Sequence, residues 1–198
     1  MVNIVYYYLK DPLSNFPLGE VPIAIGRVGG KRTREISYKT YNNFNIGFMS
    51  HLIRVTKEFP FEMAHVLWNY DGPCRNVHGH SYRLFVTISG IPSENPENPK
   101  NGMVMDFSDL KSIVKSKIVD IFDHSVVVSQ SEDKEKTEMF KKLFGNTVVV
   151  PYQPTCENLV ADFAGRIEKH LPSGVDLHSL KLYETATSFA EWFASDNG

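Results

Sequence analysis

The chain has 198 residues, of which 21 are Lys or Arg and 23 are Asp or Glu, and its formal net charge is −2. This length predicts one domain, or one domain with an extension, and the near-neutral charge is not typical of a dedicated nucleic-acid-binding protein. Two cysteines cannot form a disulfide framework, no apolar run approaches about 18 residues, and the N-terminus lacks a signal-peptide pattern, so we expect a cytoplasmic protein with no membrane or nucleic-acid partner.

The first 48 residues differ from the rest in charge and in pattern. They carry six basic and three acidic residues, a net charge of +3, whereas the remaining 150 residues carry a net charge of −5. They contain three prolines and show neither the period of a strand nor that of a helix. We therefore predict an irregular N-terminal arm over 1–48 and a folded domain over 49–198. Met49 precedes the first predicted strand, which makes it a candidate alternative start.

The folded part begins with two apolar–polar alternations, which predict half-buried strands over 52–59 and 80–89. Asp106 is expected to cap the helix that follows. In chain order, the remaining predicted elements are a helix over 106–122, a charged helix over 133–144, a strand over 147–150, a helix over 154–171, and strands over 177–183 and 189–193. Strands at both ends with helices between them predict an α+β domain, with an antiparallel sheet and helices on one face.

Three histidines carry the strongest chemical signal. His78 and His80 are two residues apart at a strand start, so their side chains should point to the same face. His65, after the first predicted strand, can supply a third imidazole from a neighbouring element. Three imidazoles with an open fourth position are typical of a catalytic zinc site. An isolated pair of this spacing is more often two ordinary histidines, so the neighbouring residues decide between the two interpretations.

The residues near the three histidines favour a catalytic metal site over ordinary histidines. Cys74 lies four residues before His78, and a thiol close to a metal and an imidazole can act as a general base. Asp123 and His124 form a carboxylate–imidazole pair at a helix end, which can relay a proton but is often only a charge pair. Glu184 ends a predicted strand, where a buried carboxylate can bind two adjacent N–H groups of a heterocycle.

Six motifs then occur in order: F-x-x-A-H, C-x3-H-G-H-x-Y, G-M-V-M-D-F-x-D-L, D-H, P-T-x-E-N and E-T. Together they resemble the 6-pyruvoyltetrahydropterin synthase superfamily over residues 51–195, and most of all its bacterial 6-carboxytetrahydropterin synthase branch, which serves queuosine (7-deazaguanine) biosynthesis. The resemblance implies a T-fold: a four-stranded antiparallel sheet with helices packed on one face, assembled into oligomeric barrels. It also implies a homo-oligomer, as a hexamer, with active sites at subunit interfaces.

The resemblance also assigns roles to residues. It implies that His65, His78 and His80 bind Zn²⁺, that Cys74 accepts a proton, that His124 supported by Asp123 completes the relay, that Glu184 anchors the pterin ring, and that Thr155 and Glu157 line the pterin pocket. The sequence departs from the pattern in Ala186–Thr187–Ser188, where bacterial members often carry Cys-Thr-Ala, and in the first 48 residues, which the family generally lacks.

The implied substrate is 7,8-dihydroneopterin triphosphate. The expected reaction is its conversion to carboxytetrahydropterin with loss of acetaldehyde and triphosphate, because the short Cys-to-His spacing resembles the carboxy branch. Two alternatives stay open. One is 6-pyruvoyltetrahydropterin synthase, which only eliminates triphosphate, and the other is a non-catalytic zinc- or pterin-binding homologue. Cys74 disfavours a third branch, which carries Glu in its place.

Overall fold

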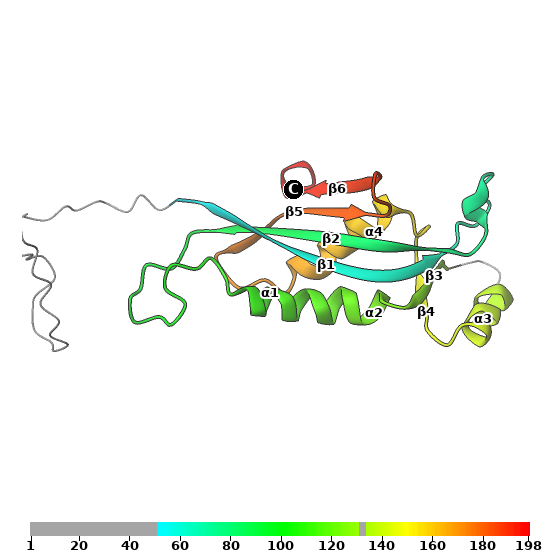
Figure 1. Ribbon diagram of the computed structural model, residues 1–198, viewed down its shortest axis with the longest axis horizontal. Helices are drawn as coiled ribbons and strands as arrows, with labels where there is room; N and C mark the ends of the chain where they lie inside the picture. Colours follow the sequence, from blue (N-terminus) through cyan, green and yellow to red (C-terminus); the bar gives the residue numbers. More distant parts are fainter. Residues whose placement is uncertain (1–50, 131–133) are drawn as a thin grey trace, which may run out of the picture. The chain divides into compact units, whose positions relative to one another are not determined.

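The computed structural model describes residues 51–130 and 134–198, so the predicted arm over 1–48 lies outside the described residues (Figure 1). The strands are β1 (Ile53–His65), β2 (His78–Gly90), β3 (Ser125–Ser129), β4 (Thr147–Val150), β5 (Val175–Tyr183) and β6 (Phe189–Phe193). The helices are α1 (Phe107–Val114), α2 (Asp120–Phe122), α3 (Lys134–Leu143) and α4 (Cys156–Glu168), and a π-helical turn over Lys115–Val119 joins α1 to α2. Within these two stretches, no helix has the length and apolarity needed to cross a membrane.

The six strands form one mixed sheet in the order β4-β3-β1-β2-β5-β6. Strands β1, β2, β5 and β6 pair antiparallel, whereas β3 pairs parallel with both β1 and β4. The prediction of a four-stranded, purely antiparallel sheet is therefore wrong. Strand β3 follows the α1–α2 helical segment and β4 follows α3, and such helical crossovers let a strand return in the same direction as its neighbour. The sequence prediction missed β3 because its short apolar run directly follows a helix with an apolar face.

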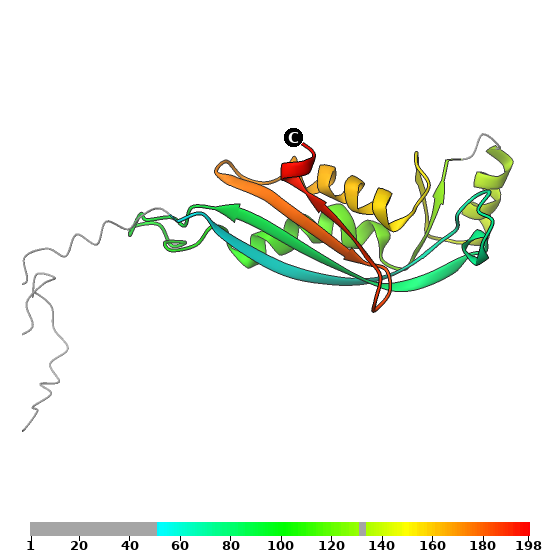
Figure 2. The same ribbon diagram turned by 90° about the horizontal axis from the view of Figure 1, so that it is seen from above.

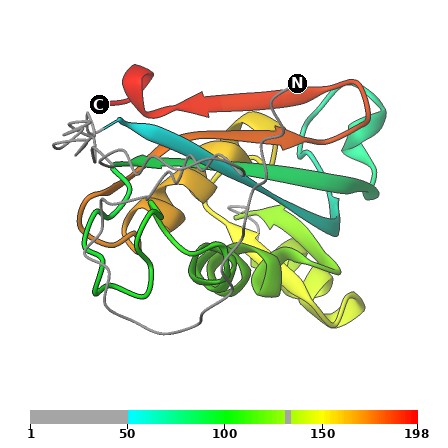
Figure 3. The same ribbon diagram turned by 60° about the vertical axis from the view of Figure 1, so that its left-hand side comes forward.

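The core lies between one face of the sheet and the helices α1 and α4, which cover the same face (Figures 2 and 3). In β1 the odd-numbered residues from Phe59 to His65 are buried and the even-numbered ones are not, and β2 buries Tyr82, Leu84, Val86 and Ile88. This alternation is the period-2 pattern of a sheet with one covered face. We call the covered side the inner face and the other side the outer face. The inner face also carries the histidines.

Helix ends follow the sequence signals. Asp106 accepts a hydrogen bond from the Ser108 backbone N–H, which confirms the predicted cap of α1. Thr155 caps α4, its hydroxyl oxygen accepting from the Asn158 N–H at 3.4 Å. Strand β1 extends six residues beyond its predicted end at 59, so His65 is its last residue rather than part of a following loop.

Two glycines provide a test of this packing. A Cβ at Gly90, the last residue of β2, would lie 2.9 Å from the Gly174 carbonyl oxygen and 2.9 Å from a methyl carbon of Val104. We expect Gly90→Ala to lower the free energy of unfolding by about 1–3 kcal/mol, because the contacted backbone has to shift. The matched variant is Gly165→Ala within α4, where no described atom lies within 4 Å of the added Cβ. It should raise stability by roughly 0.5–1 kcal/mol. Urea titration measures both, and equal effects would contradict the proposed packing.

Candidate active site

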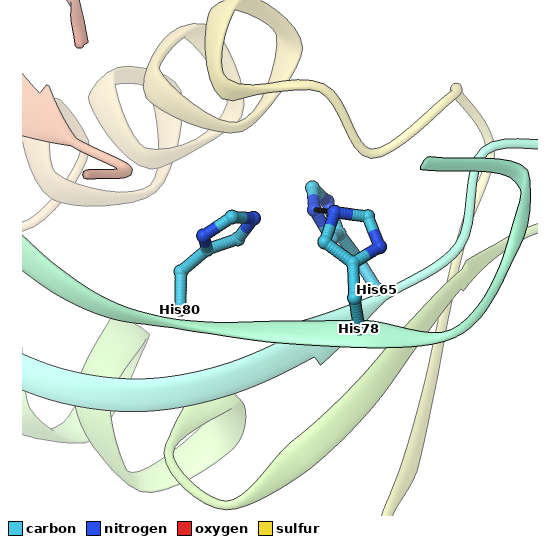
Figure 4. A group of neighbouring side chains, drawn as sticks. All are labelled: His65, His78 and His80. Atoms are coloured by element: carbon cyan, nitrogen blue, oxygen red, sulfur yellow. Dashed lines mark hydrogen bonds between the residues drawn. The ribbon is translucent and has the colours of Figure 1, made fainter. Parts of the chain in front are cut away.

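Three imidazoles meet where β1 ends and β2 begins. His65 pairs directly with His78 across the two antiparallel strands, and His80 follows two residues later on the same face of β2. Figure 4 shows the three rings rising from one side of the two strands. The Nε2 atoms of His65 and His78 are 3.1 Å apart, and one nitrogen from each of the three rings lies within 4.8 Å of the others. The spacing of two residues and the strand register together explain this convergence.

The hydrogen bonds of these rings fit a metal ion. Nδ1 of His65 lies 2.7 Å from the Pro154 carbonyl oxygen, and Nδ1 of His78 lies 2.9 Å from the Asn76 carbonyl oxygen. Because a carbonyl only accepts, each Nδ1 carries a proton, so that in the neutral form of each ring Nε2 presents a lone pair. Two lone pairs at 3.1 Å are unfavourable without a cation between them. Nitrogens bound to a tetrahedral zinc ion lie about 3.4 Å apart, close to the observed separation.

The surroundings of His80 also fit a bound metal ion. Its Nε2 atom is buried and has no hydrogen-bond partner among the described residues. A buried polar atom without a partner costs free energy, and a metal ion would supply the missing interaction. Burial lowers the pKa of both His65 and His80, although the Glu184 carboxylate opposes the shift. Both rings therefore stay neutral to a lower pH than an exposed histidine, and the neutral form is the one that binds metals.

Glu184 and Tyr82 lie beside the three rings. One carboxylate oxygen of Glu184 is 3.6 Å from Nε2 of His65 and 4.0 Å from Nε2 of His80. The hydroxyl of Tyr82 donates to that same oxygen at 3.3 Å. Burial and then the Glu184 charge raise the pKa of Tyr82, so its hydroxyl remains a donor. Tyr82 was not among the predicted site residues; the signal in the sequence is its position two residues after His80, which puts it on the same face of β2.

Cys74 lies in the connection between β1 and β2, within a single 3-10 turn over Pro73–Arg75. It is a free, half-buried thiol, and its carbonyl oxygen accepts at 3.1 Å from the backbone N–H of Leu67, which lies two residues after His65. Thr155 is half-buried and follows Pro154, the residue that accepts from His65. Glu157 is exposed in the first turn of α4. These residues therefore lie on segments that adjoin the three histidines.

The Asp123–His124 pair lies elsewhere in the chain. The Asp123 carboxylate is 2.9 Å from Nδ1 of His124 and also accepts from the Glu62 backbone N–H, while the His124 N–H donates to the Glu62 carbonyl oxygen. His124 adopts a left-handed φ of 56° and its side chain is 79% exposed. With Glu62 and Ser81 it lines an open hollow of about 390 Å³. Glu62 and Ser81 point to the outer face of the sheet, so the hollow, and His124 with it, lies on that face, and His80 also contributes to the lining.

Comparison with known proteins defines first the class of fold and then the family. The structure is similar to an uncharacterized protein of Wolinella succinogenes (TM-score 0.61, 21% identity, 73% of this chain and 99% of that chain). It is also similar to the 6-pyruvoyl tetrahydropterin synthase of Caenorhabditis elegans (TM-score 0.52, 22% identity, 73% and 96%). At 21% and 22% identity these similarities show the fold alone, an α+β fold that this chain shares with both proteins.

The sequence comparisons identify the family. The family model for 6-pyruvoyl tetrahydropterin synthase matches residues 54–194, and the chain belongs to this family. A 6-carboxy-5,6,7,8-tetrahydropterin synthase of Haemophilus influenzae is 41% identical over 143 residues, which cover 71% of this chain and 99% of the relative. Another from Synechocystis is 32% identical over 142 residues, 71% of this chain and 92% of the relative. The resemblance inferred from the six motifs is confirmed.

Proposed function

We propose that this protein is a zinc-dependent lyase, a 6-carboxy-5,6,7,8-tetrahydropterin synthase. It would convert 7,8-dihydroneopterin triphosphate and water to 6-carboxytetrahydropterin, acetaldehyde and triphosphate, in the route to queuosine and other 7-deazaguanines. The observation that carries the proposal is the convergence of three imidazoles beside the Glu184 carboxylate, in a chain 41% identical to a relative of that name. Both cysteines are free thiols, in keeping with a cytoplasmic location.

His65, His78 and His80 would hold the zinc ion, leaving its remaining position open to the substrate. The bound metal would act as a Lewis acid on the side-chain oxygens of the pterin. Pro154 and Asn76 hold two of the ligand rings through their Nδ1 protons, so that Nε2 faces the metal. Glu184 would accept hydrogen bonds from the amino group and N3–H of the pterin ring, with Thr155 and Glu157 lining the pocket.

Cys74 would accept a proton from the substrate side chain, as a thiolate general base. His124, oriented by its 2.9 Å contact with Asp123, would relay this proton. Because His124 lies on the outer face, it would serve the site of a neighbouring subunit. We therefore propose a homo-oligomer, a hexamer, in which each active site combines Cys74 of one subunit with Asp123 and His124 of another.

Mixing inactive Cys74→Ala and His124→Ala subunits should restore part of the activity, because some mixed sites contain both groups.

Incubation with 7,8-dihydroneopterin triphosphate tests the proposed reaction. Release of acetaldehyde together with a 6-carboxypterin product is the expected result, measured by chromatography and mass spectrometry. A pyruvoyl product with triphosphate release alone would instead identify a 6-pyruvoyltetrahydropterin synthase. Stoichiometric zinc without any turnover would identify a binding homologue. Each of the last two outcomes would overturn the proposed activity.

Tyr82→Phe tests how Glu184 is held. The variant removes the hydroxyl that donates to Glu184 and keeps the ring that stacks on Phe61 at a centroid distance of 5.3 Å. We expect KM for the pterin to rise about 5–10-fold, since one hydrogen bond contributes roughly 1–1.5 kcal/mol, with unchanged zinc content. Tyr183→Phe, on the outer face, is the matched control. Steady-state kinetics measures both variants, and equal KM values would refute this role of Tyr82.

A further inference from the structure

Gln153, in the segment between β4 and α4, makes two hydrogen bonds to the main chain of one distant residue. Its side-chain oxygen accepts from the Trp68 N–H at 3.2 Å, and its side-chain nitrogen donates to the Trp68 carbonyl oxygen at 2.7 Å. The two residues are 85 positions apart in the sequence and both are half-buried. A two-point contact of this kind fixes both the distance and the orientation of the segments it joins.

The residue next to Gln153 holds a proposed metal ligand. Pro154 accepts the hydrogen bond from Nδ1 of His65 at 2.7 Å, and His65 lies three residues before Trp68. Two consecutive residues therefore contact the same distant segment: Gln153 binds Trp68, and Pro154 binds His65. The His65 ring is 2% exposed, so it has little room to adjust if this pairing changes.

Trp68 extends the connection to the segment that carries Cys74. The backbone N–H of Leu67, its immediate neighbour, donates to the Cys74 carbonyl oxygen at 3.1 Å. The Trp68 indole N–H donates to the Ser129 carbonyl oxygen at 3.2 Å, and its ring packs edge-on against Phe140 of α3 at a centroid distance of 5.2 Å. Trp68 is thus held at its main chain by Gln153 and at its side chain by β3 and α3.

We infer that Gln153 is a positioning residue, which sets the place of the Cys74 segment relative to the His65 metal ligand. It contacts neither ring nor thiol itself and acts through Trp68 and through its neighbour Pro154. The inference rests on the proposed function for the roles of zinc and Cys74. No sequence pattern points to Gln153, because its amide binds main-chain groups, which every residue has.

The test uses the full-length zinc-loaded protein and three variants. Gln153→Leu removes both hydrogen bonds at similar volume. Gln153→Glu keeps the acceptor for the Trp68 N–H and places an oxygen against the Trp68 carbonyl. Gln130→Leu is the matched control, because Gln130 is exposed after β3. Each protein is assayed for zinc affinity by chelator competition, for the rate of Cys74 alkylation by iodoacetamide followed by peptide mass spectrometry, and for kcat and KM.

We expect Gln153→Leu to weaken zinc binding about tenfold, since residues that hold metal ligands contribute about 10–100-fold in affinity. The alkylation rate of Cys74 should change at least threefold and kcat should fall about tenfold, while KM changes less than threefold. Gln153→Glu should lie between this variant and the wild type, and Gln130→Leu should match the wild type.

A Gln153→Leu protein with wild-type zinc affinity, alkylation rate and kcat would overturn the inference. So would a lower melting temperature with these three quantities unchanged, which would show a merely structural role. If Gln153→Leu does not fold, the Gln153→Glu variant decides by the same criteria. Failure of the wild-type protein itself to bind zinc or turn over the pterin would instead refute the proposed function, so the two failures are distinguishable.

Discussion

His80→Ala is expected to lose stoichiometric zinc and to lower kcat/KM by at least about 1,000-fold. The variant removes one of three imidazoles, and two ligands cannot hold the open, three-ligand geometry of a catalytic zinc site. His80 is the most informative of the three for this test, because its buried Nε2 has no hydrogen-bond partner among the described residues. A change in metal content can then be attributed to lost coordination rather than to a lost protein hydrogen bond.

The measurement is zinc per subunit by atomic absorption after dialysis against a metal-free buffer. His170→Ala is the matched control, since His170 is exposed beyond the end of α4 and its ring contacts the Arg166 carbonyl oxygen rather than the three grouped histidines. The control should retain wild-type zinc and activity. Full zinc content in the His80 variant would refute its assignment as a ligand.

Cys74→Ala should lower kcat by about 100- to 10,000-fold while leaving zinc content unchanged. General-base catalysis contributes a factor of this size, and Cys74 is not among the three grouped metal-binding side chains. The expected result therefore separates the base from the metal: the His80 variant loses both zinc and turnover, whereas the Cys74 variant loses turnover alone. Product formation and zinc content are measured on the same preparation.

The second cysteine supplies the control. Cys156 is buried at the start of α4, its thiol donates to the Leu182 carbonyl oxygen at 3.2 Å, and burial raises its pKa to about 12. A thiol in that state stays protonated near neutral pH and is a poor base. Cys156→Ser should therefore keep kcat within about threefold of the wild type, with at most some loss of stability. Full activity of Cys74→Ala would exclude Cys74 as the base.

The sequence predicted local structure correctly where residues a few positions apart determine it. Alternation predicted β1 and β2, and Asp106 and Thr155 begin their helices as capping residues. The prediction failed at β3, whose short apolar run shows no polar alternation and directly follows a helix with an apolar face. A strand of this kind is hard to separate from a helix end by periodicity alone. The parallel pairing of β3 and β4 also depends on contacts between distant segments, so the four-stranded antiparallel expectation was wrong.

In the candidate site, too, the sequence predicted the features that depend on neighbouring residues. The His-x-His spacing fixes which face of β2 carries His78 and His80, because successive side chains of a strand alternate. The third imidazole and the motif order were also readable in the sequence, and the family comparison confirms the membership they indicated. The Cys74→Ala and His124→Ala variants test the proposed roles of these two residues directly, and Tyr82→Phe tests how Glu184 is held.

The sequence by itself determined the residue types of this site, its short-range geometry and its family, because each depends on neighbours within a few positions along the chain. Only the tertiary structure decided that His65 lies opposite His78, that Tyr82 donates to Glu184, that Gln153 holds Trp68, and that His124 lies on the outer face. These contacts join residues 13 to 102 positions apart, and Gln153 binds main-chain groups of Trp68. Strand register and helix packing create such contacts, and no local pattern in the sequence records them.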